Sequence, residues 1–137
     1  MAERRPDRPL GPGHDEFWGW CAAGELRLQR CSVCGHLSWP AVADACERCD
    51  STELTWERMS GLGTVVSACT FARDYFRDTF PIPWDTILVE LDEGALLISD
   101  PVGFTRDDIG PAMRVAVTFI ECEDSAGPFR LPVFAPA

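Results

Sequence analysis

The sequence predicts a mainly β protein that combines one N-terminal helix, a metal-binding ribbon and a small five-stranded barrel. Three observations lead to this prediction. A short segment with an apolar face begins at His14, and two Cys-x-x-Cys pairs follow, separated by the residues from Gly35 to Ala45. From Ser60 onward the chain holds only strand-like runs divided by turn residues. We therefore expect a helix over residues 14–24, a ribbon over 25–58 and a barrel over 59–137.

Length and composition allow a real hydrophobic core. The 137 residues are 46% hydrophobic, which suits one ordinary domain or a small domain beside a metal-stabilised one. Apolar runs are much shorter than the roughly 18 residues of a membrane span, so none is expected. Residues 1–13 are charged and proline-rich and lack the apolar segment of a signal peptide, which predicts a disordered tail. Seven cysteines, an odd number, favour a reducing cytoplasm over a secreted disulfide framework.

The N-terminal helix is predicted from its apolar spacing and its ends. One face carries Phe17, Trp20, Cys21 and Gly24 at helical spacing. Asp15 is a candidate N-cap, and Gly24 suits the residue just past the helix end. Trp18 lies off this face. The simpler interpretation is that Trp18 packs on the ribbon or barrel; the alternative is that Phe17, Trp18 and Trp20 contact a partner.

The ribbon is predicted from the cysteine spacing. Its four candidate ligands are Cys31, Cys34, Cys46 and Cys49. Two such turns brought together place four thiolates in a tetrahedron, which is the arrangement of structural zinc sites, with iron as the alternative metal. Four sulfur ligands leave no open position for water or substrate, so the metal is expected to stabilise the fold. His36 is interpreted as a surface residue because the cysteines already complete the site.

The barrel is predicted from five strand-like runs, the first of them long and marked by glycines. The runs cover residues 61–71, 85–91, 95–99, 113–120 and 129–134. Five strands with a long, bent first strand favour a Greek-key barrel of the OB type, because a β-sandwich usually needs about seven strands. Pro132 interrupts the last run and indicates an edge strand.

The connection between the first two barrel strands, residues 72–84, is long and rich in aromatic and basic side chains. The candidate ligand-binding residues in and beside it are Phe71, Arg73, Arg77, Phe80 and Trp84. Arginine suits bidentate contact with phosphate, and the aromatic rings could cover an apolar group. The plainer interpretation is that the two arginines pair on the surface with the aspartates that follow them, which contributes little.

Taken together, these motifs resemble the DUF35 family of small proteins. The resemblance rests on Gly24-Glu25-Leu26, on Gln29-Arg30-Cys31 leading into the two cysteine pairs, on Gly61-x-Gly63-Thr64-Val65 and on the hairpin from Val89 to Gly94. It covers about residues 14–134 and implies a rubredoxin-like zinc ribbon followed by an OB-fold domain. The second cysteine pair, Cys46-Glu47-Arg48-Cys49, departs from the family's frequent Cys-Pro-x-Cys, which should not affect metal binding.

The resemblance also implies a function. Family members associate with thiolase-superfamily enzymes that act on acyl-CoA, among them aldolases of steroid side chains, enzymes that form hydroxymethylglutaryl-CoA and C-acyltransferases. The chain is expected to be a separate, non-catalytic accessory subunit that binds or positions acyl-CoA in a hetero-oligomer with a sterol-carrier-protein-type thiolase. A retro-aldolase complex is favoured because the aromatic loop suits a bulky acyl group.

Two other function classes are weighed against this one. Independent nucleophilic catalysis needs a base beside the nucleophile, and the sequence offers only His14 and His36. A ribbon followed by an OB barrel also occurs in nucleic-acid-binding proteins. The net charge of −10, with no lysine in the chain, opposes binding to phosphate backbones, so no nucleic acid is expected as a partner.

Overall fold

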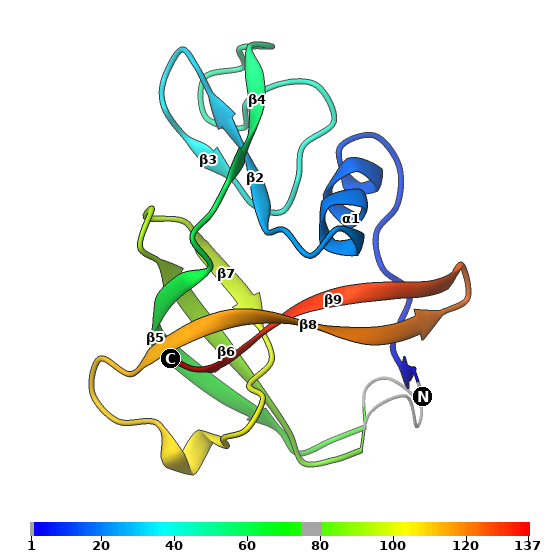
Figure 1. Ribbon diagram of the computed structural model, residues 1–137, viewed down its shortest axis with the longest axis vertical. Coiled ribbons are helices and arrows are strands. Elements are labelled where there is room, and N and C mark those ends of the chain that lie inside the picture. The colour runs from blue at the N-terminus through cyan, green and yellow to red at the C-terminus, as the bar shows by residue number, and fades with distance from the viewer. Residues whose placement is uncertain (1, 75–80) are drawn as a thin grey trace.

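The computed structural model describes residues 2–74 and 81–137. It consists of a small β-ribbon that stands above a barrel, with one helix packed beside both (Figure 1). The predicted fold class, mainly β with an N-terminal helix, a ribbon and a barrel, is confirmed. Within the described residues, no helix has the length and apolar character needed to cross a bilayer.

The N-terminal residues differ from the predicted disordered tail. Strand β1 (Glu3–Arg4) pairs in parallel with strand β8 (Arg114–Asp124) of the barrel. Arg5 is buried, and residues 6–13 lead from the barrel to the helix. Composition pointed to disorder because proline and charge dominate this segment. The contacts that order it are made to carboxylates distant in sequence, chiefly Asp100 and Asp124.

Helix α1 (His14–Ala22) begins one residue before the predicted N-cap. Gly13 takes that position, and its backbone N–H donates to the Glu16 carboxylate at 3.3 Å. A Cβ on Gly13 would lie 2.1 Å from the carbonyl oxygen of Val42, so only glycine allows the helix start to lie against the ribbon. At the other end, Gly24 has φ 77° and follows the helix as predicted.

The ribbon is a three-stranded antiparallel sheet in the order β3-β2-β4. Its strands are β2 (Arg27–Cys31), β3 (Leu37–Ser38) and β4 (Leu54–Arg58). Strand β2 is central: Gln29 is paired with Ser38 on one side and Trp56 on the other. Because β2 ends at Cys31, the sheet carries the first cysteine directly to the metal site.

The barrel contains five strands, as predicted. They are β5 (Leu62–Phe71), β6 (Trp84–Leu91), β7 (Leu96–Ser99), β8 and β9 (Gly127–Pro136). Neighbouring strands run in the order β8-β5-β6-β7, and β9 pairs with β8 along its whole length. A shift in register between Val65 and Ser67 bends β5. The barrel closes through a bridge between Pro101 and Phe134, and a 3₁₀ turn, η1 (Arg106–Asp108), lies in the connection to β8.

One continuous core joins the three parts of the molecule. Phe17 and Cys21 of the helix pack with Leu26 at the start of the ribbon and with Phe134 of the barrel. Met59, which follows β4, donates its backbone N–H to the Leu26 carbonyl at 2.8 Å. Burial of these side chains fixes the ribbon and helix on the barrel, since each buried aliphatic or aromatic side chain contributes roughly 1.5–3 kcal/mol.

Candidate metal centre and apolar cavity

The four cysteines of the two Cys-x-x-Cys pairs meet at the far end of the ribbon. Their sulfur atoms all lie within 4.8 Å of one another. The sulfur of Cys31 lies 3.5 Å from that of Cys49, and the sulfur of Cys34 lies 3.6 Å from that of Cys46. Four sulfurs placed about 2.3 Å from a tetrahedral zinc ion would be roughly 3.8 Å apart, so this arrangement fits zinc.

The two turns that carry the cysteines have the same backbone design. The N–H of Gly35 donates to the Cys31 carbonyl at 2.8 Å, and the N–H of Asp50 donates to the Cys46 carbonyl at 2.9 Å. Both residues that close the turns are left-handed, with φ 78° at Gly35 and 65° at Asp50. The sequence indicated this conformation at Gly35 only. Asp50 escaped notice because aspartate adopts it less readily than glycine, although more readily than most other residues.

Backbone N–H groups in these turns favour the thiolate form of two of the ligands, Cys31 and Cys46. The N–H of Cys34 points at the sulfur of Cys31 at 3.5 Å, and this contact lowers the pKa of the Cys31 thiol to about 6. In the second turn, backbone N–H groups of Cys49 and Arg48 lower the pKa of Cys46. Thiolate is the form that binds metal, so these two cysteines favour metal binding, whereas the pKa of the Cys49 thiol is raised to about 12 among the neighbouring sulfurs.

His36 lies outside the sulfur cluster, in agreement with its interpretation as a surface residue. Its Nε2 contacts the Glu47 carboxylate at 2.8 Å. This pair joins the two cysteine turns across the ribbon. A zinc ion bound by the four thiolates would hold the same turns together from within and would supply folding energy, with no open position for a reactant.

A second feature is a mainly apolar cavity of about 450 Å³ between helix, ribbon and barrel. The helix contributes His14, Phe17 and Trp18, and the ribbon contributes Trp39, Pro40 and Ala41. On the barrel side its walls come from β5, β6, β7 and β9. Cavities of about 300–1,000 Å³ with aromatic walls are typical of small-molecule sites.

The structure places two of the five predicted ligand-binding residues in this cavity. Phe71 and Trp84 are paired at the ends of β5 and β6, and both line it. Arg73 is exposed and does not belong to the lining. Arg77 and Phe80 lie outside the described residues. Because Phe71 and Trp84 are paired, the connection between β5 and β6 leaves the barrel beside the cavity and returns to it there.

The three candidate interface residues of the helix have different surroundings. Phe17 is 7% exposed and belongs to the core. Trp18 packs edge-on against Phe129 of β9, with ring centroids 5.3 Å apart. Trp20 is half-buried and stacks under the guanidinium of Arg27 at 4.3 Å. The simpler interpretation of Trp18, packing on the barrel, therefore describes its position.

Sequence reasoning missed the ionisable residues of the cavity, which are Arg5, Asp100 and His14. Asp100 accepts hydrogen bonds from Arg5 and, at 3.2 Å, from Trp84 Nε1. The guanidinium of Arg5 also lies 4.8 Å from the centre of the Trp84 ring. Arg5 was assigned to a disordered tail, and no local pattern could have connected it with Asp100.

Comparisons with known proteins agree with this architecture. Residues 18–55 match the family model described as "ChsH2, rubredoxin-like zinc ribbon domain". A solved structure described as "Ltp2-ChsH2(DUF35) aldolase" contains a chain that is 30% identical, with a TM-score of 0.78; the alignment covers 94% of this chain and 98% of that one.

A curated relative from Thermomonospora curvata carries the name "Probable enoyl-CoA hydratase alpha subunit". It is 33% identical over 132 residues, which are 95% of this chain. The chain spans only 40% of the length of that relative.

Proposed function

This chain belongs to the DUF35 family, and on that premise we propose that it is a non-catalytic accessory subunit of a thiolase-superfamily complex that acts on acyl-CoA. The observation that carries the proposal is the likeness to the DUF35 chain of an aldolase, which extends over 94% of this chain and 98% of that one. A chain matched from end to end, with its ribbon and barrel in the same arrangement, is a candidate for the same place in a complex.

The reaction we assign to the complex is retro-aldol cleavage of a bulky acyl-CoA. The bond between the α and β carbons of a β-hydroxyacyl thioester would break, the β-hydroxyl would lose its proton and become a carbonyl, and the α carbon would gain a proton. The partner would supply the base and the acid. If the partner instead forms hydroxymethylglutaryl-CoA by condensation or transfers an acyl group, this subunit would still bind and position the acyl-CoA.

The apolar cavity is the part of this chain that we assign to the acyl group. Its volume of about 450 Å³ and its aromatic walls suit a polycyclic or branched hydrocarbon body. Phe71 and Trp84 would contact that body, while Arg73 and Arg77 of the adjoining connection would reach the phosphates of CoA. Burial of an apolar acyl group against these rings would supply binding energy of about 25 cal/mol per Å² of apolar surface removed from water.

The four-cysteine site is assigned to structural zinc. Closed ligation by Cys31, Cys34, Cys46 and Cys49 fits a role in holding the ribbon against the helix and barrel. We also assign the complex to the reducing cytoplasm, because the chain has an odd number of cysteines, seven, of which four are at metal-binding spacing.

Co-purification tests the proposal directly. The tagged, zinc-loaded chain should capture a thiolase-superfamily protein, and the pair should cleave a steroid side-chain β-hydroxyacyl-CoA that neither protein cleaves alone. Trp84→Ala should weaken binding of the acyl-CoA by the assembled complex about tenfold or more, since the large ring lines the cavity. The matched control is Trp56→Ala, which removes a half-buried ribbon tryptophan that does not line it. Recovery of RNA or DNA in place of a protein partner would contradict the proposal.

A second candidate partner is an enoyl-CoA hydratase. The relative from Thermomonospora curvata favours it through its name, and its length beyond the matched region leaves room for a further domain. The co-purification separates the two candidates, because a hydratase partner would add water to an enoyl-CoA whereas an aldolase partner would release a shorter acyl-CoA.

A further inference from the structure

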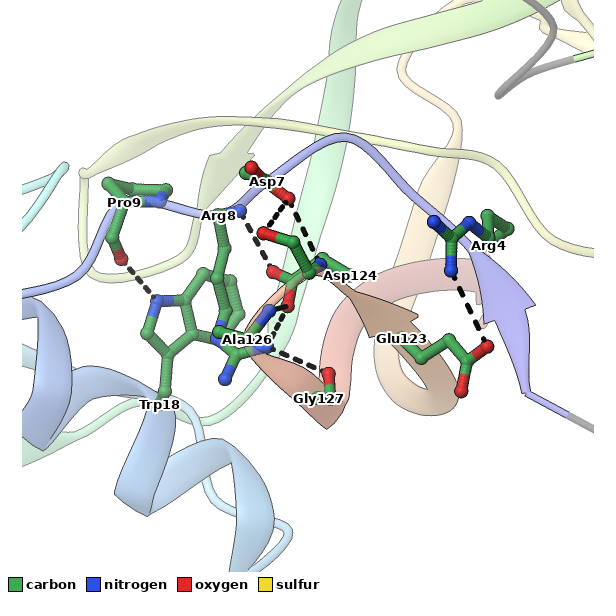
Figure 2. Close-up of polar contacts among 10 residues, drawn as sticks. Arg4, Asp7, Arg8, Pro9, Trp18, Glu123, Asp124, Ala126 and Gly127 are labelled. Carbon is green, nitrogen blue, oxygen red and sulfur yellow. Dashed lines mark hydrogen bonds and ion pairs between the residues drawn. The ribbon is translucent and has the colours of Figure 1, made fainter.

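The N-terminal strap, residues 3–9, crosses from the β8–β9 hairpin to helix α1 (Figure 2). At its start β1 pairs with β8, and the backbone N–H of Arg5 donates to the Glu123 carbonyl at 3.0 Å. At its end the Pro9 carbonyl accepts a hydrogen bond from Trp18 Nε1 at 2.9 Å. The strap therefore spans the side of the molecule on which helix and barrel face each other.

The inner side of the strap is a wall of the apolar cavity. Arg5 and Pro9 both line it, and the side chain of Arg5 is only 7% exposed. Its guanidinium pairs with Asp100 and covers the Trp84 ring. Among the described residues that line the cavity, Arg5 is the only arginine. The strap therefore gives the cavity both part of its wall and a positive charge.

The strap is attached by polar and stacking contacts. Arg8 donates to the Asp124 carboxylate at 3.0 Å and lies 4.4 Å from the centre of the Phe129 ring. Asp7 accepts a hydrogen bond from the Ser125 hydroxyl at 2.7 Å. None of residues 3–9 belongs to the buried hydrophobic cluster. The strap is therefore held by backbone pairing, ion pairs and ring contacts, and not by the apolar core.

A buried thiol under the strap reports whether it is in place. Cys122 of β8 is paired with Glu3 and is 0% exposed. Burial raises the pKa of this thiol, and the charged groups of Arg5, Glu3 and Asp100 lie near it. A reagent that modifies thiols can reach Cys122 only after local opening, and separation of the strap, which pairs with it through Glu3, is the opening that the test below examines.

We propose that the N-terminal strap is a movable wall of the cavity, which controls the entry of the apolar group and limits its width. The inference rests on the proposed function, in which the cavity receives the acyl body of an acyl-CoA. With the strap closed, the cavity ends at the guanidinium of Arg5, which lies over the Trp84 ring. With the strap open, a polycyclic body can enter from the side, whereas a narrow straight chain depends less on this movement.

The test compares two variants of the full-length, zinc-loaded chain. The Arg5→Gln/Arg8→Gln variant removes the two side chains that anchor the strap. The matched control, Arg58→Gln/Arg130→Gln, removes the same charge from two exposed arginines outside the strap, which pair with Glu25 and Glu121. Zinc content and circular dichroism establish that each variant is folded.

Two measurements are made on each protein. Alkylation of Cys122 by iodoacetamide, followed by peptide mass spectrometry, should accelerate about tenfold or more in the anchor variant and less than about twofold in the control, since modification follows local opening. Dissociation of two CoA thioesters is measured by tryptophan fluorescence. In the anchor variant, a steroid-acid CoA thioester should dissociate about fivefold faster or more, and octanoyl-CoA less than about twofold faster, because the strap has to open for the wider ligand to leave.

The outcomes separate the two ideas. Alkylation of Cys122 that is unchanged, or that rises equally in the control, overturns the movable wall. Equal effects on both thioesters overturn its role in limiting width. If the wild-type chain and its complex bind neither thioester, the proposed function fails, while the alkylation rates still decide whether the strap moves. Should the anchor variant fail to fold, Asp7→Ala serves instead, because Asp7 is exposed and its side chain accepts hydrogen bonds from Ser125 of the hairpin turn. This variant should raise the alkylation rate about twofold to threefold.

Discussion

The side-chain amide of Gln29 pairs with both backbone polar groups of Val42. Its Nε2 donates to the Val42 carbonyl at 2.9 Å, and its Oε1 accepts from the Val42 N–H at 2.8 Å. Gln29 is only 4% exposed. Because the carbonyl of Val42 also faces Gly13 at the start of the helix, this one amide sets the distance between the ribbon loop and helix α1.

Replacement of Gln29 by methionine should therefore destabilise the protein. The change keeps the length of the side chain but leaves two backbone groups of Val42 without partners, at a cost of roughly 1–3 kcal/mol. Urea denaturation measures the loss. Ser32→Ala is the control, since it removes an exposed hydrogen bond to the Glu53 carbonyl. Equal losses in the two variants would contradict the proposed importance of the buried pair.

Removal of one metal ligand should release zinc and loosen the ribbon. Cys34→Ser should lower the zinc content from about one ion per chain to below about 0.1, because structural zinc supplies much of the folding energy of such sites. Cys69→Ser is the matched control, an exposed thiol on β5 outside the sulfur cluster. Mass spectrometry under native conditions measures the zinc. Zinc retained at full occupancy in the Cys34→Ser variant would contradict the assignment.

The barrel should be sensitive to a single methyl group at Gly63. A Cβ there would lie 2.6 Å from the Glu90 carbonyl oxygen of the neighbouring strand and 2.8 Å from Val89 Cγ1. Gly63→Ala should cost roughly 1–3 kcal/mol, since β5 and β6 would have to separate. Gly110→Ala is the control because open space surrounds that position. Thermal unfolding compares the variants, and equal melting temperatures would argue against the close strand contact.

Asp85 should make stability depend on pH in the acid range. The backbone N–H of Arg106 at 2.8 Å, followed by the hydroxyl of Thr70 at 2.7 Å, lowers the pKa of this carboxyl from 3.8. A folded-state pKa below the unfolded value gives stability that is fully present above about pH 4 and is lost as the pH falls through the lower, folded value.

The difference in unfolding free energy between wild type and Asp85→Asn should consequently shrink between pH 6 and pH 3. The carboxyl is largely solvated, so the whole effect should stay at or below about 1 kcal/mol. Asp44→Asn, at an exposed position in the ribbon, is the control substitution. If the difference in unfolding free energy between wild type and Asp85→Asn stays constant down to pH 3, the Asp85 charge does not contribute to stability and the prediction is wrong.

The elements that depend on local pattern were predicted well. Four cysteines at fixed spacing, the apolar face of the helix with Gly24 at its end, and alternating runs from Ser60 onward all carry their signal within a few residues. Errors at this level were small: β8 extends to Asp124 beyond the expected end at Ile120, and the N-cap of the helix is Gly13 and not Asp15.

The N-terminal strap and the cavity could not be predicted in the same way. The partners of Arg5 and Arg8 are Asp100 and Asp124, which are 95 and 116 residues away. Proline and charge normally indicate disorder because such segments bury too little apolar surface. Here ion pairs and stacking on Trp84 and Phe129 order the segment instead.

The sequence by itself determined the metal site, the order of helix, ribbon and barrel, and the family resemblance. Each of these features depends on the spacing of residues that are close together in the chain. Only the tertiary structure decided what surrounds the cavity. The walls come from helix, ribbon, barrel and strap at once, and their meeting depends on packing between residues remote in sequence. For Trp84 the sequence indicated an aromatic side chain beside a long loop, and the fold placed Arg5 over its ring.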